Sequence, residues 1–80
     1  MGKVRYMENL KAFLNGLSRE NQELFAARCN TSLGYLRKAI SLRQQLGAAL
    51  CVNIERESVG FVRCEELRPD VDWAYLRKSN

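Results

Sequence analysis

The strongest constraint on this chain is the segment QELFAARCNTSLGYLRKAI, residues 22–40, in which a polar patch separates two stretches of helical apolar spacing. Asn30 is expected to end the first helix, because Asn tolerates the left-handed conformation better than any residue except Gly. Ser32 can then cap a second helix that begins at Leu33. The segment therefore predicts two helices joined by a turn of about three residues.

A further helix is expected on the N-terminal side of this pair. Its apolar side chains recur at i, i+3, i+4 and i+7: Leu10, Phe13, Leu14 and Leu17. This spacing predicts an amphipathic helix over residues 8–15, ended by Gly16. Ser18 is expected to cap the next helix. The stripe that this second helix is expected to bury comprises Leu24, Phe25, Ala26 and Cys29.

The helix after the turn is predicted to have one buried and one exposed face. Leu36, Ala39 and Ile40 are expected to pack against the preceding helix, which small Ala26 allows to approach closely. The residues expected to face outward are Leu33, Gly34, Arg37, Lys38 and Ser41, with Tyr35 near the edge.

The C-terminal half is compatible with two structures. Leu46, Leu50 and Ile54 are spaced four apart, which favours a helix from about residue 45 to 58. The apolar segments on either side of residues 57–60 could instead pair as a β-hairpin, the less favoured alternative. Overall, an all-α fold of about five short helices is expected.

Two features follow this helix. A short helix over residues 63–67 is expected to stop before Pro69, because proline disfavours helical geometry in the residue that precedes it. Trp73 is interpreted as a core residue, and the alternative is an anchor in a dimer interface.

Length and composition are those of one small globular domain. The 80 residues bury roughly 60% of their unfolded surface, and a chain that is 46% hydrophobic and 28% charged is neither a disordered tail nor a membrane protein. The N-terminal residues lack the apolar core of a signal peptide, so a cytoplasmic location without membrane association is expected. We expect a disordered basic arm at residues 1–7, the domain at 8–73 and a tail at 74–80.

The residue types present argue against catalysis and metal binding. The chain has no histidine, so neither a Ser-His nor a Cys-His nucleophile can be assembled, and it has no glycine-rich phosphate loop. Cys29, Cys51 and Cys64 lack metal-site spacing and are interpreted as reduced, buried small residues. The acidic residues of the segment 65–72 are interpreted as a solvated surface or as a match to the dipole at a helix N-terminus, rather than as an acid/base pair. We therefore expect a protein that is not an enzyme and that uses no cofactor or metal.

Positive charge is concentrated in the middle of the chain. The formal net charge is +4, yet no acidic residue lies between Glu23 and Glu55. The cations in that interval are Arg28, Arg37, Lys38 and Arg43. This asymmetry is typical of a surface that binds a polyanion, although it is also compatible with an ordinary solvated surface.

The central segment resembles the helix-turn-helix motif of the λ-repressor-like phage regulators. In that motif Gln opens, Ala sits fifth, a Gly-like residue turns ninth and a branched apolar residue sits fifteenth. The residues that carry the resemblance are Gln22, Phe25-Ala26, Cys29-Asn30-Thr31-Ser32, Leu36 and Ala39.

A second and more specific stretch, residues 51–71, resembles the tail of the Cro and YdaS-like antitoxin branch of these regulators. The matching positions are Cys51, Ile54-Glu55, Gly60 and Glu65-Glu66-Leu67-Arg68-Pro69-Asp70. The positions that depart from the family pattern are Asn30 in place of Gly, Gly34 in the first turn, Gly47 in place of Pro and Arg63 in place of a Thr or Ser cap.

The resemblance implies sequence-specific binding of double-stranded DNA. It implies that the helix over residues 33–40 enters the major groove while the preceding helix crosses the backbone, a docking geometry known from λ repressor and Cro. The residues expected at the DNA interface are Gln22, Ser32, Leu33, Gly34, Tyr35, Arg37, Lys38 and Arg43. Arg37 can donate two hydrogen bonds to guanine, and Lys38 can contact either guanine or a phosphate. The resemblance places Gln22 at a phosphate.

The resemblance leaves two function classes open. The first is a Cro-like repressor of phage or prophage type that binds its operator as a homodimer, because one such domain reads only a few base pairs. The second is an antitoxin or another protein-interaction module on the same fold, with a protein partner and with DNA binding secondary. The acid-free stretch favours the first class, whereas Gly34 leaves room for the second, because it leaves a gap where a base-reading side chain could have been.

Overall fold

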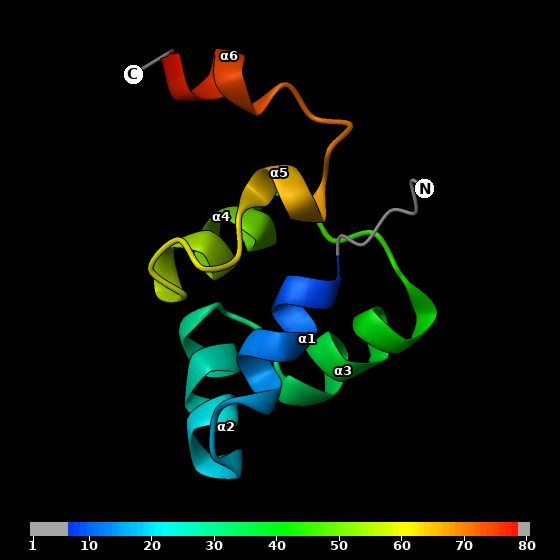
Figure 1. Cartoon of the computed structure of the whole chain (residues 1–80), viewed down its shortest axis with the longest axis vertical. Helices are drawn as coiled ribbons and strands as arrows, with labels where there is room; N and C mark the ends of the chain where they lie inside the picture. The colour runs from blue at the N-terminus through cyan, green and yellow to red at the C-terminus, as the bar shows by residue number, and fades with distance from the viewer. Residues whose placement is uncertain (1–6, 79–80) are drawn as a thin grey trace.

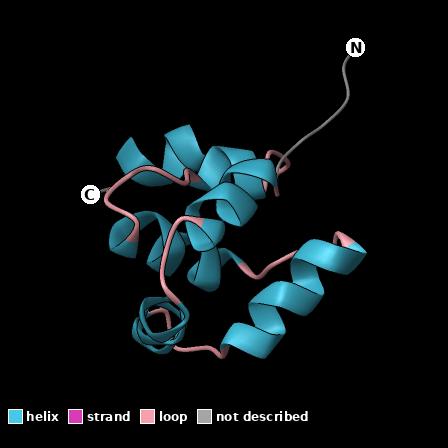
Figure 2. Cartoon of the chain, turned by 60° about the horizontal axis from the view of Figure 1, so that its bottom comes forward, coloured by secondary structure: helices cyan, strands magenta, loops and turns pink. Residues whose placement is uncertain are grey.

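A computed structural model describes residues 7–78, which form only helices and loops (Figures 1 and 2). The helices are α1 (Glu8–Asn15), α2 (Arg19–Arg28), α3 (Leu33–Leu42), α4 (Ala48–Glu57), α5 (Cys64–Leu67) and α6 (Trp73–Lys78). The all-α fold is therefore confirmed, and the alternative of a C-terminal hairpin is wrong. No helix in the described part of the chain has the length and apolar composition needed to cross a bilayer.

The helices form two groups along the long axis of the molecule. Figure 1 shows α1, α2 and α3 together at one end, whereas α4, α5 and α6 occupy the other. One hydrophobic core joins the two groups. Its buried residues are Met7, Leu10, Leu14, Phe25, Ala26, Cys29, Leu36, Ala39, Leu46, Cys51, Ile54, Val62, Cys64, Leu67 and Trp73.

The predicted caps set the helix ends around the central turn. The Ser18 hydroxyl oxygen accepts a hydrogen bond from the Asn21 N–H at 3.2 Å, and the Ser32 hydroxyl oxygen accepts one from the Tyr35 N–H at 3.1 Å. Asn30 has a φ of 69°, so it adopts the left-handed conformation expected of it. The local chemistry thus fixes the break between α2 and α3.

The three cysteines are free and buried, as predicted. Burial raises the pKa of the Cys29 and Cys51 thiols to about 11. The Cys64 thiol lies beside the Glu55 carboxylate as well, and burial together with this carboxylate raises its pKa to about 12. All three thiols are therefore protonated near neutral pH and act as small core residues.

The buried face of α2 differs from the expected one. The apolar pattern predicts a buried Leu24, but its side chain is 47% exposed, whereas Gln22 is only 8% exposed. The buried positions Gln22, Phe25, Ala26 and Cys29 follow the spacing i, i+3, i+4 and i+7. The first residue of the buried stripe is thus a polar one, Gln22, which the pattern of apolar residues alone does not reveal.

Other element boundaries differ as well. Helix α4 begins at Ala48, after the expected start near residue 45, because Leu46 is buried in the preceding loop and Gly47 is the extended N-cap. Met7, placed in the predicted arm, is buried in the core, while residues 1–6 of that arm lie outside the described residues. Helix α6 occupies most of the segment expected to be a tail.

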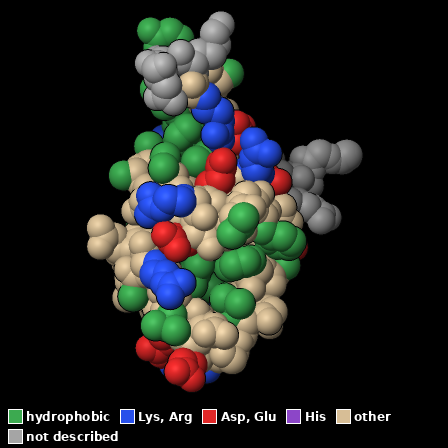
Figure 3. Space-filling model, turned by 90° about the vertical axis from the view of Figure 1, so that its left-hand side faces the viewer, with side chains coloured by type: hydrophobic (Ala, Val, Ile, Leu, Met, Phe, Trp, Pro, Cys, Tyr) green, Lys and Arg blue, Asp and Glu red, His purple; other side chains and the backbone are tan. Residues whose placement is uncertain are grey.

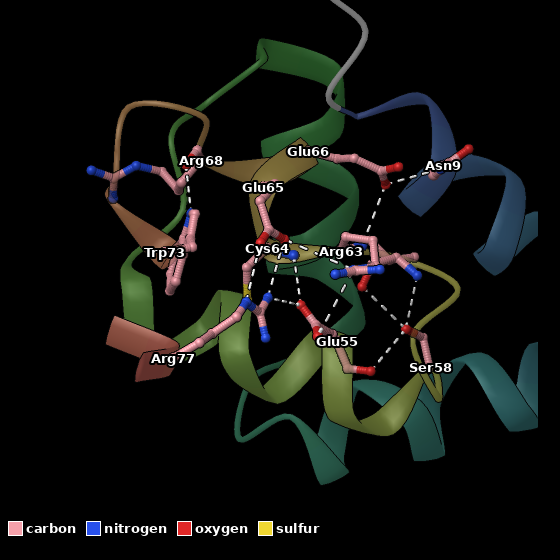
Figure 4. A network of polar contacts seen from close by, with 11 residues as sticks. Asn9, Glu55, Ser58, Arg63, Cys64, Glu65, Glu66, Arg68, Trp73 and Arg77 are labelled. Carbon is pink, nitrogen blue, oxygen red and sulfur yellow. Dashed lines mark hydrogen bonds and ion pairs between the residues drawn. The ribbon is translucent and has the colours of Figure 1, made fainter. Parts of the chain in front are cut away.

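A polar network holds the C-terminal helices together (Figure 4). The Glu55 carboxylate on α4 accepts hydrogen bonds from the Cys64 backbone N–H and from the Arg77 guanidinium, both at 2.9 Å. Arg77 also donates to Glu65 at 3.1 Å. Glu55 therefore caps α5 and anchors α6 through a single carboxylate.

Trp73 completes this attachment. Its side chain is 5% exposed, and its indole N–H donates a 2.7 Å hydrogen bond to the Arg68 carbonyl oxygen. The interpretation of Trp73 as a core residue is therefore confirmed, because its ring is buried and its indole N–H has a hydrogen-bond acceptor within the chain.

The Glu55 network predicts a specific dependence of stability on pH. The hydrogen bond from Arg77 is the main cause that lowers the pKa of Glu55 from 4.5 to about 2. A carboxyl group with a depressed folded pKa stabilises the fold above its unfolded pKa and loses that contribution as pH falls toward the folded value. We expect Glu55→Gln to reduce the free energy of unfolding most at neutral pH, with the difference from wild type shrinking between pH 4.5 and 2.

Urea titrations at several pH values measure this difference. The control is Glu23→Gln, which alters an exposed pair with Arg19 and should change stability little. A difference between wild type and Glu55→Gln that stays constant across the interval would contradict the assignment.

Candidate nucleic-acid interface

The residues proposed for DNA contact occupy different environments in the α2–α3 pair. Four of them are exposed: Ser32, Gly34, Lys38 and Arg43. Leu33, Tyr35 and Arg37 are half-buried, and Gln22 is buried. Most of the predicted face of α3 is therefore accessible to a ligand, whereas Gln22 lies beneath it.

Gln22 is held inside the protein by its own amide. The amide nitrogen donates to the carbonyl oxygens of Leu14 and Leu17, at 2.8 and 3.1 Å. Its oxygen accepts a 3.1 Å hydrogen bond from the Arg37 guanidinium. Gln22 thus links the end of α1 to α3, a position distinct from the open phosphate-contacting site that the resemblance implied.

Arg37 is fixed between three helices. Besides Gln22 on α2, its guanidinium donates a 3.2 Å hydrogen bond to the side-chain oxygen of Asn15, the last residue of α1. Asn15 carries no sequence signal for this role, because the contact depends on how α1 packs beside α3. The structure therefore adds Asn15 to the residues around the predicted interface.

A hollow of about 400 Å³ lies between α2 and α3. Gln22, Ser32, Leu33, Gly34 and Arg37 line it, together with the exposed pair of Arg19 and Glu23. The fold thus brings five of the predicted residues together. Tyr35, Lys38 and Arg43 do not line this hollow, and Arg43 instead caps the end of α3 with a φ of 54°.

Ion pairs with carboxylates concentrate in the C-terminal half of the molecule, with the Arg19–Glu23 pair on α2 as the exception. Among the described residues, the arginines in ion pairs with carboxylates are Arg19, Arg56, Arg63, Arg68 and Arg77. The four cations of the acid-free interval, Arg28, Arg37, Lys38 and Arg43, form none within that described set. Folding therefore leaves these four cations without a carboxylate within ion-pair distance among the described residues, and their charge can attract a polyanion.

A second hollow, of about 560 Å³, lies between α4 and α6 and outside the predicted interface. Val52, Val59 and Leu76 contribute apolar side chains to it, and Arg56 and Arg77 contribute cations. These three apolar side chains are 46, 92 and 48% exposed. On the face drawn in Figure 3, hydrophobic side chains gather beside interspersed basic and acidic ones.

Gly34 offers a test of whether the fold itself requires glycine in α3. A Cβ added there would meet only the Ser32 hydroxyl oxygen, at 4.0 Å, whereas Gly60 has a φ of +82° that side chains disfavour. We expect Gly34→Ala to raise the free energy of unfolding by up to about 1 kcal/mol through helix propensity.

The matched variant Gly60→Ala should instead lower the free energy of unfolding by about 1–2 kcal/mol, because the substitution forces a residue with a side chain into the left-handed region. Denaturant titrations measure both changes. A destabilised Gly34→Ala would show that the fold needs the glycine.

Comparison with known proteins places this arrangement in a family. Residues 21–76, which include α3 to α5 and most of α2 and α6, match the family described as bacterial toxin YdaS. A protein named "Putative transcriptional regulator YdaS" from Escherichia coli (strain K12) is 61% identical over 36 residues, which are 45% of this chain and 37% of that protein. The match thus spans well under two thirds of that relative's length. No solved structure shows significant similarity to the chain. The extent of the family match, over more than half of the chain, establishes that the protein belongs to the YdaS family.

Proposed function

We propose that this protein is a sequence-specific DNA-binding transcriptional regulator, a Cro-like repressor of phage or prophage type. Helix α3 enters the major groove, and α2 crosses the backbone. The observation that carries the proposal is the positive charge of Arg37 and Lys38 on α3, neither of which forms an ion pair among the described residues, next to a capped turn of helix-turn-helix form. The name of the Escherichia coli relative, which is that of a regulator, supports the same class.

The proposed complex is a homodimer on a pseudo-palindromic operator. One α3 helix reaches only a few base pairs, so two copies on half-sites one helical turn apart supply the specificity of a regulator. The proposal includes no catalytic activity and no cofactor. The contacts to DNA come from the side chains around α3, with Arg37 on a base and Lys38 and Arg43 on bases or phosphates.

A second candidate is a protein-interaction module of toxin or antitoxin type, with DNA binding secondary. The family description as a toxin supports it, as does the α4–α6 hollow. Val59 is a β-branched residue with a φ of 55° and a side chain that is 92% exposed. An apolar side chain that buries nothing, on a backbone conformation costing about 1–2 kcal/mol, favours a role at a contact surface.

Selection from a randomised duplex library near physiological salt separates the two candidates. Recovery of a symmetric motif, followed by tight and salt-dependent binding of the selected duplex, supports the dimeric regulator. If no motif emerges and binding is weak and independent of sequence, the regulator is excluded and the interaction module is retained.

Arg37→Ala is expected to weaken binding of the selected duplex by about 1–3 kcal/mol and to relax preference at one base position. The reason is the loss of a guanidinium that can donate two hydrogen bonds to guanine O6 and N7. Equilibrium titrations on the selected duplex and on single-base variants measure both effects. Unchanged affinity in a folded variant would remove Arg37 from the interface.

Lys38→Ala and Arg43→Ala are expected to act through charge. Each should reduce the slope of log K against log salt by about one if the side chain contacts a phosphate. The control is Arg56→Ala on α4, which pairs with Glu57 and lies outside the α2–α3 pair. Titrations at several salt concentrations measure the slopes, and a slope equal to that of wild type would exclude the phosphate contact of that residue.

A further inference from the structure

Arg37 differs from most other arginines of this chain in the acceptors that hold it. The guanidinium groups of Arg19, Arg68 and Arg77 donate to carboxylates at 2.8–3.2 Å. Arg37 donates instead to two neutral amide oxygens, those of Asn15 and Gln22, at 3.2 and 3.1 Å. The Arg37 guanidinium is thus held by hydrogen bonds to uncharged acceptors.

Neutral acceptors and carboxylates affect the charge of a guanidinium differently. A carboxylate within ion-pair distance offsets the positive charge of a guanidinium, whereas an amide oxygen orients the group and leaves its charge intact. A guanidinium has five N–H donors, of which the two contacts use two, so three remain for a ligand. Arg37 is therefore held in place and still able to bind an anionic, acceptor-rich ligand.

The two amides hold Arg37 in different ways. Gln22 is 8% exposed, and its side-chain amide nitrogen donates hydrogen bonds to the carbonyl oxygens of Leu14 and Leu17. Its side-chain oxygen is therefore turned toward Arg37. Asn15 is exposed at the end of α1 and makes no other side-chain hydrogen bond within residues 7–78. Loss of the Gln22 side chain would disturb the core, but loss of the Asn15 side chain would disturb only Arg37.

We propose that Asn15, which lies outside the helix-turn-helix segment, is a positioning residue for DNA recognition that orders the Arg37 guanidinium at the hollow between α2 and α3. The inference rests on the proposed function. Because the side chain of Arg37 is already ordered, less conformational entropy is lost when it contacts a base. Asn15 thus raises affinity and sharpens the preference at the base that Arg37 reads, without touching DNA itself.

A double-mutant cycle tests this role, with wild type, Asn15→Ala, Arg37→Ala and the double variant titrated on the selected duplex. Asn15→Ala is expected to weaken binding by about two- to tenfold, the range for the ordering of one long side chain, and to relax the same base position as Arg37→Ala. In the Arg37→Ala background it should have no further effect, because the partner is gone. Thermal unfolding confirms that each variant is folded.

Two further variants sharpen the test. Asn15→Asp places a carboxylate beside Arg37, so it should weaken binding more than Asn15→Ala does. Asn9→Ala removes another asparagine side chain of α1, one that donates to Glu66 on α5 at 2.9 Å and lies outside the α2–α3 pair, and should leave binding unchanged.

The outcomes distinguish the inference from the function on which it rests. Wild-type affinity in Asn15→Ala, or an equal loss in both Arg37 backgrounds, overturns the role of Asn15 while the regulator stands. Tighter binding of the duplex by Asn15→Asp than by wild type also overturns the role of Asn15. A wild-type protein that binds no duplex specifically overturns both the regulator and the positioning role.

Discussion

The close packing of α2 against α3 is the constraint on which the rest of the structure depends. Ala26 and Ala39, one on each helix, are almost fully buried, and Leu36 on α3 is fully buried as well. Small side chains at such a contact let two helices approach closely, and tight packing leaves little freedom in their relative orientation. The buried face of α3 is thereby fixed, and its opposite face, with Gly34 and Lys38, is presented to solvent.

Electrostatics then divides the molecule into two parts. In the C-terminal half, Glu55 links α4, α5 and α6 through Arg77 and the backbone of Cys64, so charge there is used to hold helices together. In the helix-turn-helix half, Arg37 and Lys38 have no carboxylate partner within the described residues. The same kind of side chain thus serves stability in one half and remains available for a polyanion in the other.

Much of the candidate interface could be predicted because it depends on local chemistry. The caps Ser18 and Ser32 and the turn at Asn30 involve contacts within a few residues of the chain, so the sequence pattern alone places them. The inward orientation of Gln22 could not be read in this way. An apolar pattern assigns the buried stripe to Leu24, whereas the geometry of α2 buries a glutamine whose polar groups are satisfied by α1 and α3.

The sequence by itself determined the all-α class, the span of α1, the starts of α2 and α3, the buried cysteines and the charge asymmetry, since each follows from spacing, caps or composition. Only the tertiary structure decided that Asn15 reaches Arg37, that α6 docks through Trp73, and that Val59 is exposed on a strained backbone. These features depend on the angles and distances between helices, which the packing of the common core sets and which no local pattern encodes.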